Sequence, residues 1–292
     1  MIPFESSANA HIASRASERT RTVYEADLAR WVSFCKLEDI KLEAPSADAG
    51  PKFRDALQKI LAPATVRRIL AALSSIYGAA VAKNPPLATW NPVNPKALPW
   101  PPSAKFGKTQ AVSAEIAEKM IAAAEADLSL DGTRDAAILR LLYETGLRRM
   151  SIVGLLRANV LADGIARVTV KGAEEAEVEL PRTSFVAVMR WINCQEGLYV
   201  FPKRGDLKRS MDVGTINKIV RARAKEVGAE KVHPHQFRAA FVTSAINSGV
   251  YMPDIQASVH HKDARTTQMY DRGKRGFGVT GAVAKARRGE NR

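Results

Sequence analysis

The sequence has little cysteine and no long apolar run. Its 292 residues include only two cysteines, Cys35 and Cys194, which lack the paired spacing of a disulfide framework or a zinc site. No stretch of about 18 or more apolar residues is present, which argues against a transmembrane helix. The first five residues have neither the basic nor the apolar region of a secretory signal, so we expect a soluble chain that is not secreted. We expect no metal and no cofactor.

Acidic residues are also few relative to basic ones. The chain has 44 lysines and arginines against 30 aspartates and glutamates, which gives a formal net charge of +14 and a pI near 9.9. A field of this size attracts polyanions. Nucleic acid is the first candidate partner and a membrane surface the second. The missing apolar span makes the membrane the weaker candidate.

The first third of the chain predicts a small helical bundle. Apolar residues from Tyr24 to Cys35 recur at helical spacing, and residues 65–82 form a second strongly helical stretch. The pattern stops at Asn84, before two prolines, and five more prolines lie at 92, 95, 99, 101 and 102. Such a segment is not helical and predicts a semi-rigid connector. We therefore expect domains at residues 1–105 and 106–292.

The second part predicts a mainly helical domain with a small β-sheet. Residues 113–126 and 133–144 fit helices, and the second helix ends before Gly146, a residue suited to a left-handed cap. Two short alternating runs, 166–170 and 176–180, predict a β-hairpin with a polar tip. Helices are then expected again at 184–193, 213–227, 235–247 and 253–259.

Several short motifs in the second part matter more together than singly. Alone, Arg148 is most simply a helix cap or a surface ion pair, and Tyr270 a packing aromatic. Their order and spacing resemble the tyrosine recombinase (phage integrase) family over residues of about 113 to 275. That family typically has TGLR, a hairpin KG, HxLR, GH and TTxxY. The matching segments are Thr145-Gly146-Leu147-Arg148, Lys171-Gly172, His235-Gln236-Phe237-Arg238, His261 and Thr266-Thr267-Gln268-Met269-Tyr270.

The chemistry of these residue types suits a phosphodiester. Cleavage without a metal requires neutralisation of charge on the non-bridging oxygens, and the forked donors of Arg148 and Arg238 are suited to it. A tyrosine hydroxyl can form a covalent link that stores the bond energy without ATP. The resemblance implies that Tyr270 forms a 3′-phosphotyrosyl bond and releases a 5′-hydroxyl.

The resemblance also implies roles for three further residues. Lys171 would protonate the leaving 5′-oxygen, and His235 would assist proton transfer at the nucleophile. His261 would hydrogen-bond a phosphate oxygen. The N-terminal bundle resembles the core-binding domain of the family, which with the catalytic domain would form a two-domain clamp around DNA.

Three positions depart from the common family pattern. Ser151 stands where many members have an acidic residue, Ala239-Ala240 stands in place of a frequent His-Thr, and His260 replaces a glycine. None of them removes a predicted catalytic residue. They indicate that the residues supporting the site are arranged differently, which affects the rate.

Basic residues elsewhere are candidates for contacts with the DNA backbone. The alternative for each is a solvated helix face. One candidate, Arg221, lies on a predicted helix with Lys218, Arg223 and Lys225, and we expect these three to contact phosphates as well. The candidates are Arg67, Arg68, Lys203, Arg204, Lys208, Arg209 and Arg221.

The sequence thus favours a site-specific DNA recombinase, metal- and ATP-independent, acting on double-stranded DNA in the cytoplasm. As the resemblance implies, two protomers would bind each site and four would form a synapse that exchanges strands through a Holliday junction, with accessory DNA-bending proteins as further partners. The alternatives are a non-catalytic DNA-binding protein on the same fold and a type IB topoisomerase, which relaxes supercoils as a monomer.

Overall fold

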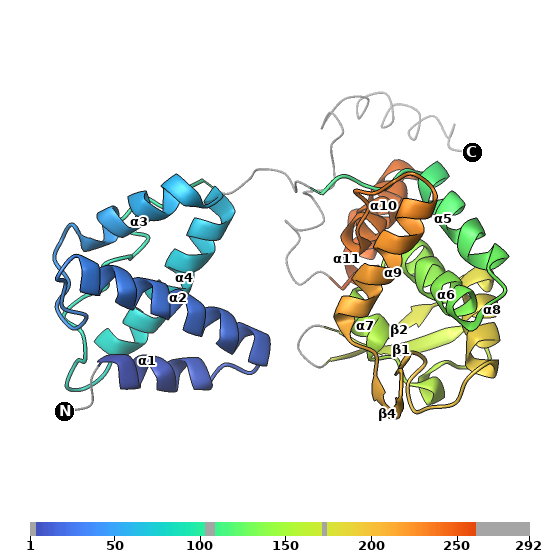
Figure 1. The fold of residues 1–292 in the computed structure, drawn as a ribbon, viewed down its shortest axis with the longest axis horizontal. Coiled ribbons are helices and arrows are strands. Elements are labelled where there is room, and N and C mark those ends of the chain that lie inside the picture. The colour runs from blue at the N-terminus through green and yellow to red at the C-terminus, as the bar shows by residue number, and fades with distance from the viewer. Residues whose placement is uncertain (1–3, 103–108, 171–173, 261–292) are drawn as a thin grey trace, which may run out of the picture. The chain divides into compact units, whose positions relative to one another are not determined.

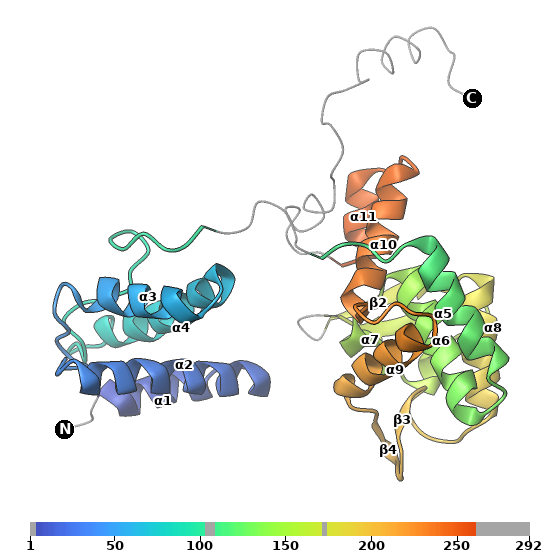
Figure 2. The ribbon, with the colours of Figure 1, turned by 45° about the horizontal axis from the view of Figure 1, so that its top comes forward.

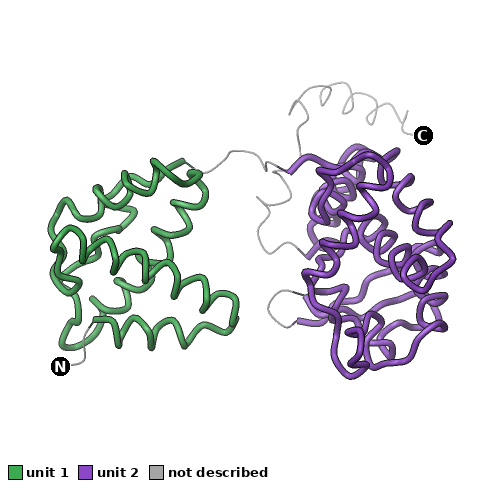
Figure 3. The backbone as a smooth tube through the Cα atoms, viewed as in Figure 1, with its two compact units in different colours: residues 1–105 green, residues 106–292 purple. Residues whose placement is uncertain are grey.

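The chain divides into two compact units, residues 1–105 and 106–292, each with its own hydrophobic core (Figure 3). This computed structural model describes residues 4–102, 109–170 and 174–260. Both units are mainly helical there, and the second contains small antiparallel sheets. The predicted fold class, mainly helical with a little β-structure in the C-terminal part, is confirmed.

Within residues 4–102 the first unit has four helices (Figure 1): α1 (Phe4–Ala13), α2 (Glu18–Leu37), α3 (Ala49–Ile60) and α4 (Pro63–Val81). The sequence predicted α2 and α4 but not the other two. Both missed helices bury an apolar residue at every fourth position, at 4, 8 and 12 and at 49, 53 and 57. Stripes of three apolar residues are too short to separate from loop by periodicity, and Pro51 in the first turn of α3 adds a misleading signal.

The core of the first unit is centred on Trp31 of α2. Its side chain is fully buried and contacts the ring of Phe53 edge-on, with 5.0 Å between centroids. The indole Nε1 donates to the Tyr77 hydroxyl at 2.8 Å, and that hydroxyl donates to the Leu42 carbonyl at 2.9 Å. Both polar ends of this aromatic pair are therefore satisfied, which removes the cost of burying them.

The proline-rich segment is non-helical, as predicted, but it packs on the first unit. Val93 and Leu98 are buried in that core. The Trp100 indole donates to the Val93 carbonyl at 3.0 Å, and the Arg67 guanidinium lies over the Trp100 ring and donates to the Pro101 carbonyl. Residues up to 102 are thus part of the folded unit, and a free spacer does not begin at the first proline.

The second unit is built around α6 (Leu130–Thr145), which packs against α5 (Ala114–Ala126), α8 (Arg182–Asn193) and α10 (Pro234–Asn247). The long helices agree with their predicted ranges to within a few residues. Elements of five residues or fewer other than the predicted hairpin were missed, because so few positions give no usable period. The other elements between residues 109 and 260 are α7 (Arg149–Val153), the 3-10 helix η1 (Arg157–Asn159), β1 (Ile165–Thr169), β2 (Glu175–Glu179), β3 (Pro202–Lys203), β4 (Asp206–Ser210), α9 (Val213–Glu226) and α11 (Met252–Ser258).

The described part of this unit contains two β-hairpins. Strands β1 and β2 pair antiparallel with Val168 opposite Ala176, and the alternation predicted for β1 is confirmed because Ala166 and Val168 are buried while Arg167 is exposed. The tip at residues 171–173 lies outside the described residues. Strands β3 and β4 form a second hairpin, which extends from the helical body of the unit (Figure 2).

Several features expected from the composition can be checked directly. Neither Cys35 nor Cys194 is in a disulfide, and burial raises the pKa of the Cys35 thiol to about 12. This thiol is therefore unreactive at neutral pH. In the described part of the chain, no helix has the length and apolar character needed to cross a membrane.

Arg223 is not the surface cation that the sequence suggested. Its side chain is 7% exposed, and its guanidinium bonds Asp127 at 2.6 Å and Asp135 at 2.9 Å. It also pairs with Glu226 at 3.1 Å. The hydrogen bond from Arg223, followed by those from Ser129, lowers the pKa of Asp127 to about 2. The prediction of a phosphate contact at Arg223 was wrong, because the residue ties α9 to α6 and to the end of α5 by ion pairs.

We expect Arg223→Met to lower the free energy of unfolding by about 3 kcal/mol, near the lower limit for breaking a buried ion pair, because Asp135 keeps Arg134 as a partner. Chemical denaturation followed by circular dichroism measures this change. Arg221→Met on the same helix is the matched control, since Arg221 is exposed, and should cost less than about 0.5 kcal/mol. Equal losses in the two variants would contradict the structural role of Arg223.

Candidate active site

Three of the predicted catalytic residues meet at one pocket of about 240 Å³: Arg148, His235 and Arg238. Arg148 immediately precedes α7, and the other two lie three positions apart on α10. Positions three apart share one face of a helix, which is why both reach the same pocket. Lys171, His261 and Tyr270 lie outside the described residues, and their predicted roles stay predictions.

The turn before Arg148 depends on the residues Thr145 and Gly146. The Thr145 hydroxyl donates to the Leu141 carbonyl at 2.5 Å and accepts from the Leu147 amide at 3.3 Å, so it closes the end of α6. Gly146 has a φ of 62°, as predicted for a left-handed cap, and a β-carbon there would lie 2.7 Å from the Phe241 ring. Only glycine satisfies both requirements. The turn then directs the chain from α6 to Arg148.

Main-chain carbonyls hold both arginines. The Arg148 guanidinium donates to the Val259 carbonyl at 3.3 Å and to the His260 carbonyl at 3.2 Å. Arg238, 4% exposed, donates to the Gly146 carbonyl at 2.6 Å and also to the Val259 carbonyl. The carbonyls at the end of α11 thus link the two cations. Each guanidinium presents five N–H donors in a planar fork, the geometry that matches phosphate oxygens.

The surroundings of His235 favour the neutral form of its ring. Partial burial of its ring lowers the pKa of His235, and the positive charges around it, that of Arg238 first, lower it further. A neutral imidazole can accept a proton. An anion bound between the arginines would offset their charge and raise this pKa again. The site therefore offers two fixed cations and a base.

Ser151 and the two alanines show how the departures from the family pattern are accommodated. The Ser151 side chain is buried, and its hydroxyl donates to the Thr169 carbonyl at 2.8 Å. This bond joins α7 to the end of β1, two residues before Lys171. Ala239 and Ala240 are buried on α10. A hydroxyl thus connects the two segments that carry Arg148 and the hairpin lysine.

His260 occupies a backbone position that favours glycine. Its φ is 50°, in the left-handed region, and within the described residues its buried Nε2 has no hydrogen-bond partner. Burial lowers the pKa of this histidine, with smaller effects from the charges of Arg148 and Arg238. The conformation explains why glycine suits this position. The histidine adds backbone strain next to the carbonyls that bind Arg148 and Arg238.

We expect His260→Gly to raise the free energy of unfolding by about 1 kcal/mol. A left-handed backbone costs a residue with a β-carbon roughly 1–2 kcal/mol, and the glycine's extra freedom in the unfolded chain offsets part of that gain. Thermal unfolding measures the change. His260→Ala is the matched control, because it removes the ring but keeps the β-carbon. A glycine variant no more stable than the alanine variant would show that backbone strain is not the cause.

The predicted DNA-contact residues fall into three groups. The β3–β4 hairpin, which the sequence did not predict, carries four of them and leaves most of its basic side chains exposed. Arg221 is exposed on α9. In the first unit, Arg68 donates to both carboxylate oxygens of the buried Asp27, so its guanidinium is paired with a carboxylate within the unit. The four residues of the hairpin are Lys203, Arg204, Lys208 and Arg209.

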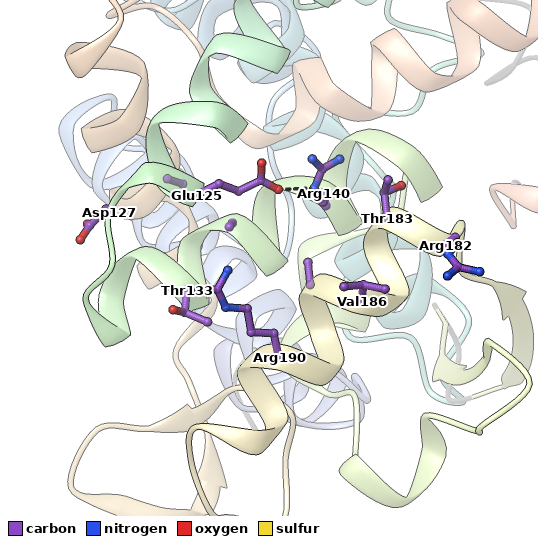
Figure 4. Close-up of a pocket in the computed structure, with 11 residues that line it drawn as sticks. Glu125, Asp127, Thr133, Arg140, Arg182, Thr183, Val186 and Arg190 are labelled. Atoms are coloured by element: carbon purple, nitrogen blue, oxygen red, sulfur yellow. Dashed lines mark hydrogen bonds and ion pairs between the residues drawn. The ribbon is translucent and has the colours of Figure 1, made fainter.

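A second pocket, of about 380 Å³, lies among α5, α6 and α8 and contains none of the motif residues (Figure 4). Figure 4 shows the ion pair across it, in which the Arg140 Nε lies 2.6 Å from a Glu125 carboxylate oxygen. Arg182 and Arg190 of α8 also line it. This pocket is separate from the candidate active site.

The candidate active site contains one basic residue, Arg149, that was not predicted from the sequence. Its position next to Arg148 was the available signal.

The architecture agrees with the comparison to known proteins. Residues 110–275, more than half of the chain, match the model of the phage integrase family. The chain belongs to this family, that of the tyrosine recombinases, as the motifs predicted.

Named relatives support this membership along most of the chain. Tyrosine recombinase XerD of Chlorobaculum tepidum is 28% identical over 283 residues, covering 89% of this chain and 88% of the relative. Tyrosine recombinase XerC of Xanthomonas campestris pv. campestris is 27% identical over 281 residues, covering 90% of this chain and 81% of the relative.

Solved structures share the fold at low identity. The XerH site-specific recombinase bound to its difH substrate matches with a TM-score of 0.70 and 16% identity, covering 90% of this chain and 79% of that one. The Tn1549 transposon integrase in complex with a circular intermediate DNA matches with a TM-score of 0.71 and 14% identity, covering 97% and 99%. At such identities the matches establish the fold alone.

Proposed function

We propose that this chain is a site-specific DNA recombinase that cuts and rejoins double-stranded DNA through a 3′-phosphotyrosyl bond at Tyr270. The observation that carries the proposal is the meeting of Arg148, His235 and Arg238 at one pocket in a chain of this family. Two segments, the turn before α7 and the first turns of α10, supply a pair of fixed cations and a neutral base, the groups that phosphoryl transfer to a hydroxyl requires.

The proposed cleavage step moves one proton at each end of the reacting phosphate. The Tyr270 oxygen attacks phosphorus while its proton passes to His235. The bond from phosphorus to the 5′-oxygen breaks, and Lys171 donates the proton that makes the 5′-hydroxyl. Rejoining is the reverse, with a 5′-hydroxyl of another strand as nucleophile. Because the phosphotyrosyl bond conserves the energy of the broken one, no ATP is consumed, and no metal is required.

During this step the two arginines would bind the non-bridging oxygens, with His261 as a further donor. Developing negative charge on these oxygens is stabilised best by donors that are already oriented, because no reorganisation is then needed. The carbonyl bonds from Gly146, Val259 and His260 provide such orientation for Arg148 and Arg238.

The proposed roles of the units follow from the family. Residues 1–105 would be a core-binding domain and residues 106–292 the catalytic domain, and together they would clamp DNA. The structures of relatives include a XerH complex with difH and a lambda integrase dimer at a core site. For this chain we accordingly propose a dimer on each site and a tetramer in the synapse, exchanging strands through a Holliday junction in the cytoplasm, with DNA-bending proteins as accessory partners.

The test is covalent trapping on a nicked suicide duplex, in which loss of a short fragment prevents rejoining. Its design requires a recombination site, which can be selected from a random-sequence library with the Tyr270→Phe variant. We expect a protein–DNA adduct with the wild type and none with Tyr270→Phe. Binding without an adduct would instead indicate a non-catalytic DNA-binding protein. Relaxation of plasmids that lack paired sites would indicate a type IB topoisomerase.

A further inference from the structure

A second group of basic side chains borders the candidate active site. Arg149, at the start of α7, lines the same pocket as the two motif arginines. Whereas Arg148 bonds to carbonyls at the end of α11, the Arg149 guanidinium turns to α9 and donates to Oδ1 of Asn217 at 2.6 Å. Two sequence neighbours therefore direct their cations to different elements.

His233 and Arg221 complete this group. His233 immediately precedes α10, where its backbone amide donates to the Gln236 side chain at 3.0 Å. His233 directly precedes Pro234, which lines the same pocket as Arg149. Burial of the ring, and then the charges of Arg149 and Arg221, lower the pKa of His233. Arg221 is four positions after Asn217 and so lies on the same face of α9. Elements α7, α9 and the start of α10 each supply one basic group.

Between residues 4 and 260, as far as the structure describes them, no carboxylate forms an ion pair with the arginines of this group. Among the described residues, neither Arg149 nor Arg221 takes part in an ion pair, whereas Arg223, two positions further along α9, pairs with three carboxylates. Like charges held together without a counter-ion destabilise a fold unless an anion binds between them. Arg149 and His233 are also half-buried, which increases the attraction for such an anion.

We propose that Arg149, Arg221 and His233 form a second phosphate-binding subsite that holds the DNA phosphate next to the one being cleaved. The inference rests on the proposed function, since it takes the Arg148–Arg238 pocket as the site of the reacting phosphate. Consecutive phosphates of one strand advance by about 3.4 Å along the helix axis, so a neighbouring phosphate lies within reach of a neighbouring arginine. The subsite fixes the register of the strand in the pocket.

The experiment measures DNA affinity against salt in the Tyr270→Phe background, with Arg149→Gln/Arg221→Gln and His233→Asn as variants. Asparagine is chosen because it is a good N-cap residue and preserves the start of α10. We expect the double variant to bind about tenfold more weakly at about 0.15 M salt, and the slope of log K against log salt to fall by about 0.9, because one DNA phosphate is no longer neutralised. Arg190→Gln on α8, at the pocket of Figure 4, is the matched control and should leave the slope unchanged.

Adduct formation with Tyr270 intact separates the outcomes. We expect the double variant to need about tenfold more DNA for half-maximal adduct formation and to keep the wild-type rate at saturation within about threefold. If the double variant has the wild-type salt slope while the wild type still forms the adduct, the subsite is overturned and the proposed function is not affected. A large loss of the saturating rate also overturns it, because the group would then act in the chemistry. A wild type that forms no adduct overturns the proposed function itself.

Discussion

Arg238→Ala should lower the rate of DNA cleavage by at least about a thousandfold, the range seen when an arginine that stabilises phosphoryl transfer is removed. Arg238 is 4% exposed and is held by the carbonyls of Gly146 and Val259, so its fork is fixed at the pocket before DNA arrives. Neither water nor a neighbouring side chain can replace a buried, oriented donor pair. Single-turnover cleavage of a nicked suicide duplex measures the loss.

A companion variant separates charge from geometry. Arg238→Lys keeps one positive charge but cannot bond two carbonyls and a phosphate in one plane, so its rate should lie between those of alanine and wild type. Arg182→Ala, an exposed arginine of α8, is the control for loss of a cation away from the site. Cleavage by Arg238→Lys at the wild-type rate would contradict the proposed two-donor role. Because alanine also removes the hydrogen bonds to the Gly146 and Val259 carbonyls, the stability of each variant is measured in parallel.

Trp31→Ala should have the largest effect on stability, lowering the free energy of unfolding of the first unit by about 4–5 kcal/mol, at the upper end for a large aromatic in a core. Trp31 is fully buried between Phe34, Phe53 and Tyr77. Its removal leaves a cavity lined by three rings and deprives the Tyr77 hydroxyl of its donor. Denaturant unfolding followed by circular dichroism measures the change.

Trp31→Phe is the matched variant for this second prediction. It retains much of the ring volume but loses the 2.8 Å hydrogen bond to Tyr77, so it should cost roughly 1–2 kcal/mol. A loss below about 2 kcal/mol for the alanine variant would show that the unit repacks around the missing ring. On the proposed function, the unfolded first unit would also weaken DNA binding, while Trp31→Phe would bind nearly as the wild type does.

Much of the helical structure could be predicted from local sequence. The ranges of α2, α4, α5 and α9 follow from an apolar stripe that repeats every three to four residues over at least three turns. Stripes of three residues, as in α1 and α3, and the few residues of β3 and β4 give no comparable signal. Their stability comes from partners far away in the sequence, which periodicity does not record.

The charged residues of α9 show more clearly what local sequence does not determine. Arg221 and Arg223 are two positions apart on α9, so they point to nearly opposite faces of the helix. The first is exposed and the second is buried among Asp127, Asp135 and Glu226. Their sequence environments are alike, so the sequence predicts the same phosphate contact for both.

The sequence by itself determined the family of this protein and the candidates for its chemistry, because the type and order of Arg148, His235, Arg238 and the predicted residues outside the described part match the family pattern. Tertiary structure alone decided what surrounds them. It hydrogen-bonded Arg149 to Asn217 and Ser151 to the end of β1, and it gave His260 a backbone conformation that favours glycine. Such arrangements depend on which elements distant in the sequence pack together. That packing decides whether a charged side chain is buried against carboxylates, as Arg223 is, or exposed, as Arg221 is.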